Sequence, residues 1–151
     1  MPQSLVKIYV HAVFSTKERR AYLQKESLRH RMHAYLTGAC ERIGCQPMQV
    51  GGPDDHVHML FGLNRTMDIA EFIREVKRES SKWIKTQDVE AGRFRWQSGY
   101  GAFSISPAHC RSLTEYIRNQ EAHHKEESFQ DEFRRLCKKY GLELDERYAW
   151  D

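Results

Sequence analysis

A dense turn signal, Gly51-Gly52-Pro53-Asp54-Asp55, constrains the fold of this chain more than any other feature. It stands between two short runs of β-forming residues, 46–50 and 56–63. Glycine, proline and aspartate favour the tight backbone reversals that join neighbouring strands. The sequence therefore predicts an antiparallel hairpin whose second strand begins at His56.

The segments before and after the hairpin alternate between strand and helix patterns. Residues 7–14 are rich in β-formers and predict a first strand. Residues 26–43 carry apolar side chains at helical spacing, and Gly44 is a plausible stop signal. After the hairpin, Thr66 is expected to cap a second helix whose apolar stripe ends at Ile84.

An extended segment rich in aromatic residues, 94–106, follows the second helix. Gly99 and Gly101 interrupt it and indicate a bend or a bulge. Ser106-Pro107 is a strong helix start, because serine caps a helix and proline fits its first turn. This start predicts a helix that runs to about Lys125.

A last short helix is expected to begin at Ser128, with Asp131 three residues on, and to end before Gly141. The predicted order is therefore β-α-β-β-α-β followed by two helices. Its first six elements match the ferredoxin-like pattern, an α+β fold with an antiparallel sheet and helices mainly on one face. Such a fold hosts many functions, so the topology assigns no chemistry.

Length and composition narrow the class of protein. The chain has 151 residues, which fits one domain, 1–151, with 40% hydrophobic and 30% charged residues. It carries no apolar run of the roughly 20 residues that a membrane span needs and no signal-peptide pattern, so a cytoplasmic protein is expected. Reduced thiols packed as small apolar groups are expected of the four cysteines, which are Cys40, Cys45, Cys110 and Cys137.

The charge is unevenly distributed along the chain. The net charge is +3, from 24 basic and 21 acidic residues. Residues 1–35 include seven basic and two acidic residues, whereas residues 121–151 include six basic and nine acidic residues. This asymmetry indicates a positive surface compatible with nucleic acid. No P-loop, G-x-S-x-G or G-x-G-x-x-G motif occurs, which argues against nucleotide hydrolases, α/β-hydrolases and Rossmann enzymes.

The sharpest local motif is His56-Val57-His58 on the predicted third strand. Alternate side chains of a strand share a face, so the two imidazoles would lie about 6–7 Å apart on one face. They could bind one metal ion, although an isolated H-x-H pair is more often two half-exposed histidines without a ligand. Asp54 and Asp55 would either shape the turn or contact these histidines.

Tyr116 and Gln120 form a second candidate pair. Their i, i+4 spacing places them one turn apart on one helix face, beside the apolar stripe. A tyrosine there is more often a core residue than a nucleophile. A glutamine on such a stripe needs a polar partner, which a metal ion or a phosphate could supply.

Together these four residues suggest a reaction. A metal ion held by imidazoles and an amide oxygen can polarise a phosphodiester, and a tyrosine oxygen can then attack the phosphorus. His109 is a further candidate ligand. Adjacent histidines on a helix point about 100° apart and rarely bind one metal ion, so His123 and His124 are interpreted as surface or helix-terminal residues.

The chain resembles the single-tyrosine HUH transposases of the insertion-sequence 200/605 group (transposase IS200-like family). The likeness rests on four segments, which are His11-Ala12-Val13-Phe14-Ser15-Thr16-Lys17, Pro53-Asp54-Asp55-His56-Val57-His58-Met59-Leu60, Trp96-Gln97-Ser98-Gly99-Tyr100-Gly101-Ala102-Phe103-Ser104 and Tyr116-Ile117-Arg118-Asn119-Gln120. H-V-H alone is a weak signal. H-V-H followed some 58 residues later by Y-I-x-N-Q is a strong one.

The resemblance implies a DNA transposase with an HUH endonuclease-like domain. His56, His58 and Gln120 would bind a divalent metal, Mg²⁺ or Mn²⁺, and Tyr116 would be the nucleophile that forms a 5′-phosphotyrosine link and frees a 3′-OH. The substrate would be single-stranded DNA with hairpins. Family members act as homodimers, in which the tyrosine helix of one subunit can complete the partner's site, and use no nucleotide cofactor.

Two features of the chain depart from the family pattern. The acidic doublet before His56 is one Asp longer than expected, and the C-terminal helical extension, 128–151, is longer than in the smallest members. The extension resembles that of stand-alone or domesticated relatives. DNA contacts are expected from basic residues of the first loop and the second helix, namely Lys17, Arg19, Arg20, Lys77, Arg78 and Lys82.

Two other functions fit part of the sequence. A non-catalytic module that binds single-stranded or hairpin nucleic acid would use the basic N-terminal region and the aromatic residues of 94–106. A small metal-dependent nuclease would use water in place of tyrosine. Neither requires His56, His58, Tyr116 and Gln120 together.

Overall fold

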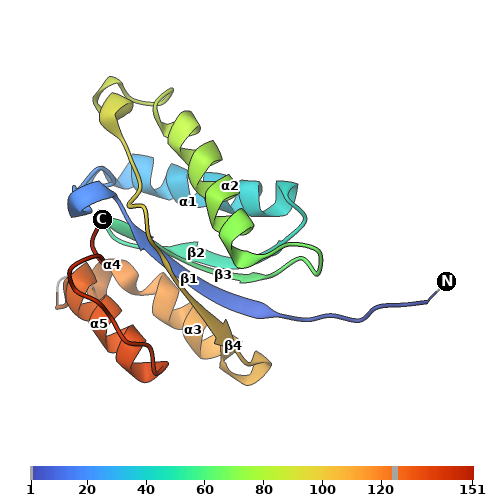
Figure 1. Ribbon diagram of the computed structural model, residues 1–151. Coiled ribbons are helices and arrows are strands. Elements are labelled where there is room, and N and C mark those ends of the chain that lie inside the picture. The colour runs from blue at the N-terminus through green and yellow to red at the C-terminus, as the bar shows by residue number, and fades with distance from the viewer. Residues whose placement is uncertain (1, 124–125) are drawn as a thin grey trace.

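A four-stranded antiparallel sheet forms the centre of the molecule (Figure 1). The computed structural model describes residues 2–123 and 126–151. Along the sheet the strand order is β2-β3-β1-β4. The strands are β1 (Tyr9–Ser15), β2 (Gln46–Gly51), β3 (His56–Gly62) and β4 (Gly101–Ile105). This order is that of the ferredoxin-like fold, so the predicted fold class is confirmed.

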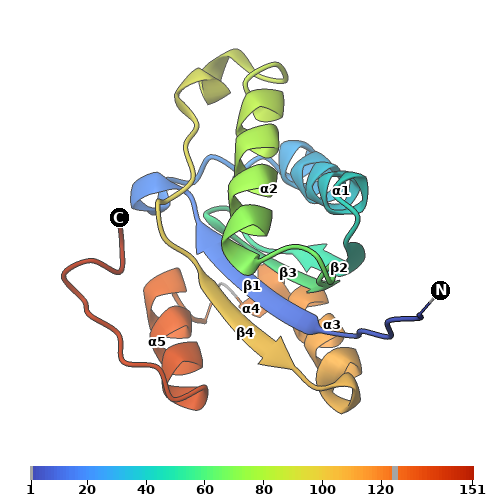
Figure 2. The ribbon, with the colours of Figure 1, turned by 45° about the vertical axis from the view of Figure 1, so that its right-hand side comes forward.

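Helices cover both faces of the sheet (Figures 1 and 2). One face carries α1 (Glu26–Arg42) and α2 (Ile69–Ile84). The other carries α3 (Cys110–Arg118), α4 (Gln120–His123) and α5 (Phe129–Lys139). Short 3-10 turns lie at Lys17–Arg19 (η1), Val89–Arg93 (η2) and Pro107–His109 (η3). The helices after β4 therefore enclose the sheet face that α1 and α2 leave uncovered.

The main hydrophobic core lies between the sheet and the helices α1 and α2. Val57, Met59 and Phe61 of β3 point into it, as the alternation of the strand predicts. Phe61 stacks on Phe72 of α2 with ring centroids 3.8 Å apart. Burial of such large apolar side chains contributes roughly 1.5–3 kcal/mol each, so this layer supplies much of the stability.

Smaller apolar clusters attach α3 and α5 to the opposite face. Phe129 and Phe133 of α5 pack near Val13 of β1, and Ile117 of α3 packs on Leu60 of β3. A close approach requires glycine on the sheet, because a Cβ at Gly101 would meet Phe133 Cε2 at 2.5 Å. The glycine expected to bend the strand thus begins β4 and admits α5 to the sheet.

The start of α2 differs from the prediction. Its N-cap is Asp68, whose side chain accepts a hydrogen bond from the backbone N–H of Glu71 at 2.7 Å. Thr66 instead donates its hydroxyl to Asn64 Oδ1 at 2.9 Å. Thr66 was the wrong cap because its hydroxyl is used within the preceding turn.

The helix expected from Pro107 to Lys125 is divided. Ser106 precedes the 3-10 turn η3, and its hydroxyl contacts His109 Nδ1 at 2.6 Å rather than a backbone N–H. The helix is interrupted again at Asn119, between α3 and α4. Its expected end at Lys125, like His124, lies outside the described residues. The last helix is as predicted, since Ser128 accepts a hydrogen bond from the Asp131 N–H.

The extended segment 94–106 forms less strand than expected. Only Gly101–Ile105 pairs as β4, and Trp96 adds an isolated bridge to Thr16. Between them, the carbonyls of Gln97 and Gly99 accept hydrogen bonds from the Lys77 ammonium at 2.8 Å each. The backbone N–H of Gln97 still donates to the Ser15 carbonyl of β1 at 2.8 Å, whereas the two carbonyls are bonded to a side chain of α2 instead of to β1.

The structure also bears on the cysteines and on membrane-spanning helices. All four cysteines are buried free thiols. Among the described residues, no helix combines the length and the apolar character that a bilayer crossing requires.

His33 of α1 is expected to make the folded state sensitive to acid. Burial lowers its pKa to about 4, and no described residue bonds to its Nε2. The unfolded chain, with a usual pKa near 6.5, takes up this proton first as the pH falls. The contribution of His33 is therefore complete above about pH 6.5 and is lost towards pH 4.

Replacement of His33 by leucine should remove this dependence. Between pH 7 and pH 4.5 we expect the wild type to lose roughly 2 kcal/mol more of its free energy of unfolding than His33→Leu loses. The measurement is urea unfolding at the two pH values. His109→Gln is the control, because His109 is an exposed histidine outside α1 that is not in contact with His33. A parallel loss of stability in both variants and the wild type would contradict the role of His33.

Candidate metal and tyrosine site

The two histidines of β3 lie on the sheet face that α3, α4 and α5 cover. His56 and His58 are both buried, with relative exposures of 1% and 0%. They share one face because they alternate with Val57 on the strand, as predicted. The helices above them follow the six elements of the ferredoxin-like pattern, and they make the two histidines buried rather than half-exposed.

Tyr116 and Gln120 approach the same point from above. Tyr116 lies in the last turns of α3, and its ring centroid is 5.8 Å from that of His58. Gln120 is the first residue of α4 and is 1% exposed. Although the helix breaks at Asn119, the i, i+4 pair still faces one site. The structure therefore brings together all four residues that the sequence singled out.

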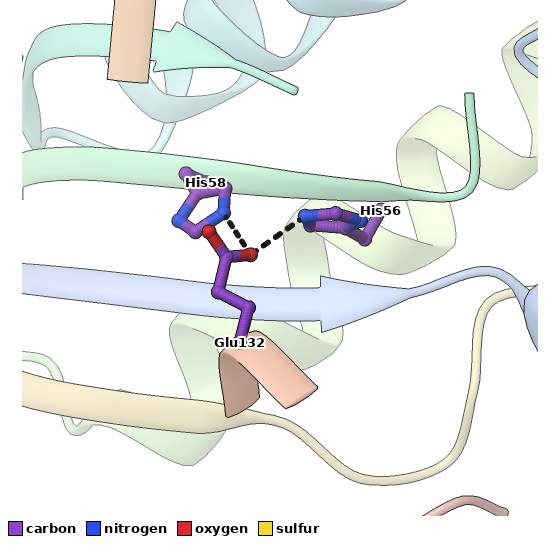
Figure 3. Close-up of side chains that lie close together, drawn as sticks. All are labelled: His56, His58 and Glu132. Carbon is purple, nitrogen blue, oxygen red and sulfur yellow. Dashed lines mark hydrogen bonds and ion pairs between the residues drawn. The ribbon is translucent and has the colours of Figure 1, made fainter. Parts of the chain in front are cut away.

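A fifth residue, Glu132 of α5, links the four others. Figure 3 shows its contacts with the two histidines. Its Oε1 lies 2.9 Å from His56 Nε2 and 3.0 Å from His58 Nε2. Its Oε2 accepts a hydrogen bond from Gln120 Nε2 at 3.0 Å and another from the Tyr116 hydroxyl. A single buried carboxylate thus contacts both imidazoles, the amide and the phenol.

The sequence analysis missed Glu132, although a signal was present. Phe129, Glu132, Phe133 and Leu136 follow the i, i+3, i+4, i+7 spacing of an apolar helix stripe. An acidic residue in that position is buried with the stripe, and a buried carboxylate needs partners. Glu132 could therefore have been selected by the argument that was applied to Gln120.

Residues outside this group fix both rings. Asp55 Oδ1 accepts a hydrogen bond from His56 Nδ1 at 2.7 Å, and His11 Nε2 lies 2.8 Å from His58 Nδ1. Asp55 therefore contacts a histidine, one of the two roles left open for the acidic doublet. Partners on the far nitrogen of a histidine commonly fix the orientation of a metal-binding ring.

The two histidines differ in charge. Burial lowers the pKa of His56, but its bonds to Asp55 and Glu132 outweigh burial and raise the pKa to about 9. Burial lowers the pKa of His58 despite its contact with Glu132. Burial raises the pKa of Glu132, yet the adjacent His58 and His56 hold it well below its usual range. In the metal-free site at neutral pH, an imidazolium at His56 faces a carboxylate at Glu132.

The phenol of Tyr116 is held in its protonated form. Burial, followed by the contact with Glu132, raises its pKa. The phenol donates to the Glu132 carboxylate, while its oxygen accepts a hydrogen bond from Arg135 Nη2 at 2.8 Å. Arg135 is itself paired with Glu127 at 2.9 Å. Tyr116 therefore has a proton acceptor on one side and a cation on the other.

The donor atoms of His56, His58 and Glu132 suit a divalent cation. One ligand atom from each lies within 4.8 Å of the others, and all three residues are buried. Imidazole nitrogen with carboxylate oxygen is a donor set that Mn²⁺ and other first-row ions accept, and carboxylate oxygen also suits Mg²⁺. Gln120 adds an amide group at the same point.

The expected DNA-binding residues divide into two sets. Lys17, Lys77 and Arg78 line one open groove together with Arg95, which the sequence analysis did not select. Arg19 instead donates to the Trp150 carbonyl at 3.2 Å. Arg20, which pairs with Glu18, and Lys82 are not among the residues lining this groove. Basic residues gather where α2 meets the segment before β4.

Burial affects one of these cations directly. It lowers the pKa of Lys77 to about 8, and the ammonium of Lys77 bonds to backbone carbonyls of the loop. Lys77 therefore holds the groove together as well as contributing charge to it.

Comparison with known proteins identifies relatives of the chain. A family model described as "Transposase IS200 like" matches residues 4–120, more than half of the chain. None of the curated proteins matches it. The match ends at Gln120, so Glu132 lies beyond the matched residues.

Two solved structures share the fold. One is a crystal structure of a protein from Deinococcus radiodurans R1 whose transposase assignment is provisional, with 19% identity, a TM-score of 0.62, and coverage of 80% of this chain and 96% of that one. The other is a REP-associated tyrosine transposase bound to a REP hairpin, with 17% identity and a TM-score of 0.57. The match covers 82% of this chain and 73% of that one. At these identities the likeness concerns the fold.

Removal of the Glu132 charge should destabilise the metal-free protein. Glu132→Gln keeps the side-chain volume but leaves the buried His56 cation with one fewer anionic partner, so we expect a loss of roughly 3 kcal/mol. The measurement is urea unfolding at pH 7 in the presence of a chelator. The exposed residue Glu143 provides the control Glu143→Gln, expected to change stability by less than about 0.5 kcal/mol. Equal stability of Glu132→Gln and the wild type would disprove the buried ion pair.

Proposed function

The chain belongs to the IS200-like transposase family, and we propose that it is a metal-dependent endonuclease and strand transferase acting on single-stranded DNA. Its nucleophile would be Tyr116, linked covalently to a DNA 5′-phosphate during the reaction. The observation that carries this proposal is the convergence of Tyr116 and Gln120 with His56 and His58 around one carboxylate.

The cation would be held by His56, His58 and Gln120, with Glu132 as a further oxygen ligand. His56, His58 and Glu132 are buried and contact a common point, which supports their assignment as ligands. Gln120 donates its Nε2 to the same carboxylate and would bind a cation by turning its amide to present the oxygen. When bound, Mg²⁺ or Mn²⁺ acts as a Lewis acid that polarises a phosphodiester. Imidazole ligands favour Mn²⁺ chemically, whereas Mg²⁺ is the more abundant ion in cells.

The residues of the chain supply the remaining parts of the step. The Tyr116 oxygen attacks phosphorus, the new O–P bond forms, and the bond from phosphorus to the 3′ oxygen breaks. The phenol proton is released to solvent as the oxygen attacks, and Arg135, which donates a hydrogen bond to that oxygen, stabilises its negative charge. The 3′ oxygen takes a proton from solvent and leaves as a 3′-OH. One phosphodiester replaces another and no water is consumed, so the reverse step can join a different 3′-OH.

Hairpin DNA is the proposed substrate. The structural relative bound to a REP hairpin supports this class of DNA. We assign the duplex backbone to the groove of Lys17, Lys77, Arg78 and Arg95, because clustered cations bind phosphates without regard to sequence.

A homodimer remains a prediction. Within one chain, Tyr116 lies next to His58, so this arrangement of the site needs no second copy to bring the phenol to the histidines. A dimer, if formed, would either exchange the tyrosine helices or leave each site within its own chain.

A non-catalytic hairpin-binding module is the second candidate. The observation that favours it is the burial of His56, His58 and Gln120 beneath α5, which leaves little access for a phosphate in this arrangement. This candidate, which includes a domesticated relative that has kept binding alone, predicts tight hairpin binding without cleavage under any divalent ion.

Tyr116→Phe should abolish the covalent intermediate. We expect no protein–DNA adduct on a denaturing gel with Mn²⁺ and labelled hairpin strands from the flanking genomic DNA, while affinity for the hairpin stays within about twofold of the wild type. Tyr148→Phe removes the hydroxyl of an exposed tyrosine and is the control, with adduct at the wild-type yield. An adduct of normal yield in Tyr116→Phe would reject Tyr116 as the nucleophile.

Loss of the cation should stop cleavage. EDTA, or replacement of the proposed ligand in His56→Ala, is expected to lower adduct formation by at least about 100-fold, and His56→Ala should also weaken Mn²⁺ binding in calorimetry by about tenfold or more. His30→Ala, at an exposed histidine, is the matched control. Cleavage that persists in EDTA would remove the metal ion from the mechanism.

A further inference from the structure

His11 of β1 is a buried histidine that the proposed function leaves without a role. It is 1% exposed, and its Nε2 lies 2.8 Å from His58 Nδ1. We propose that His11 and His58 form a two-ring relay that exchanges its tautomers when a divalent cation binds to His58 Nε2. His11 is then a positioning residue for the cation site. The inference rests on the proposed function, because it takes His58 as a metal ligand.

The register of the sheet places the two rings side by side. His11 pairs with Leu60 across β1 and β3, and His58 lies two residues before Leu60 on the same face. The ring centroids are 5.1 Å apart, and the ring planes are 20° from parallel. Val13, which lies directly opposite His58, has no polar side-chain atom. The bond to His58 Nδ1 therefore comes from His11.

The metal-free structure fixes one tautomer for each ring. Burial is the main cause that lowers the pKa of both His11 and His58, so both rings are neutral at pH 7. A neutral imidazole has one N–H and one acceptor nitrogen. Since the Glu132 carboxylate accepts from His58 Nε2, the proton of His58 is on that atom. His58 Nδ1 then accepts from His11 Nε2, which leaves His11 Nδ1 without a proton.

His11 Nδ1 is the atom that makes an exchange possible. It is buried, and no described residue bonds to it. A buried nitrogen without a partner is uncommon. A backbone N–H on this nitrogen would fix the tautomer of His11, whereas an unbonded nitrogen can take up a proton. His11 and Tyr116 line a cavity of about 310 Å³, which has room for a water molecule to accept the resulting N–H.

The exchange balances in protons. A ligand nitrogen must offer its lone pair, so the proton of His58 Nε2 leaves to solvent when the cation binds. The proton of His11 Nε2 moves to His58 Nδ1, and His11 Nδ1 takes one proton from solvent. Each ring keeps one proton and stays neutral. Only the direction of the hydrogen bond between the rings reverses.

His56 has no such freedom, which shows what His11 adds. Asp55 Oδ1 lies 2.7 Å from His56 Nδ1, and a carboxylate can only accept, so this nitrogen keeps its proton. His11 can either donate or accept. Without it, the buried Nδ1–H of a cation-bound His58 would have no acceptor. Loss of such a partner commonly weakens metal binding by about 10- to 100-fold.

The direct test is NMR spectroscopy of the protein labelled with nitrogen-15 histidine, because the two tautomers differ in the shifts of their ring nitrogens. We expect Nε2–H on both His11 and His58 in the metal-free protein. Saturation with Zn²⁺, a diamagnetic ion that binds imidazole, should give Nδ1–H on both. The signals of His11 are assigned by their loss in His11→Gln. A His11 that keeps its Nε2–H in the Zn²⁺-bound protein would overturn the relay.

Calorimetry with Mn²⁺ measures the effect on affinity. His11→Phe should weaken binding by about tenfold or more, whereas His11→Gln should stay within about threefold of the wild type, since an amide can donate or accept. His109→Phe is the matched control, because His109 is exposed and its ring contacts Ser106. Thermal unfolding verifies that each variant is folded.

Two calorimetric results would contradict the relay. One is equal affinity of His11→Phe and the wild type. The other is an equal loss in His11→Phe and His11→Gln, which would mark His11 as a packing residue alone.

The outcomes also separate the relay from the proposed function. If the tautomers stay fixed while the wild type forms a covalent adduct with DNA, the relay is overturned and the strand transferase stands. If the tautomers exchange on Zn²⁺ binding but no adduct ever forms, the relay stands and the strand transferase is rejected. A wild type that binds neither Zn²⁺ nor Mn²⁺ would reject the cation site and the relay together.

Discussion

The carboxylate of Glu132 is the interaction on which the site depends. Three imidazole or amide groups and a phenol surround it in a buried space, and each would otherwise lack part of its hydrogen bonding. Unpaired polar groups in such a space are costly, so the carboxylate fixes the relative positions of β3, α3, α4 and α5. The same atoms form a donor set for a divalent cation. Stability and the proposed chemistry therefore depend on one group.

The division of the sheet into two faces makes this arrangement possible. One face is apolar and packs against α1 and α2, so the main core contains none of the proposed catalytic residues. The other carries histidines in its strands and is covered by short helices with smaller apolar clusters. An element held by fewer buried apolar contacts opens more readily than the main core. The helix α5 is thus the element whose displacement would expose the histidines to DNA.

Substrate access follows from the same geometry. His56 and His58 are buried beneath Glu132, whereas Tyr116 is only partly buried and lines the cavity with Arg135 and Lys139. DNA would therefore meet the tyrosine and the two cations first. The groove of Lys17, Lys77, Arg78 and Arg95 is a second positive surface, to which the proposed function assigns phosphates.

The sequence by itself determined the order of the elements, the face that His56 and His58 share, and the pairing of Tyr116 with Gln120, because periodicity and turn chemistry are local properties. The predicted cap of α2 was wrong because the Thr66 hydroxyl bonds to the Asn64 side chain. The predicted strand 94–106 was too long because Lys77 bonds to the Gly99 carbonyl, a contact that the local sequence pattern does not reveal. Only the tertiary structure decided that α5 lies over the second sheet face and brings Glu132 to the histidines, 74 and more residues away in the chain. The physical reason is that the apolar stripe of α5 and the glycine at position 101 select a packing partner through space, and a buried carboxylate is stable only where that packing supplies its donors.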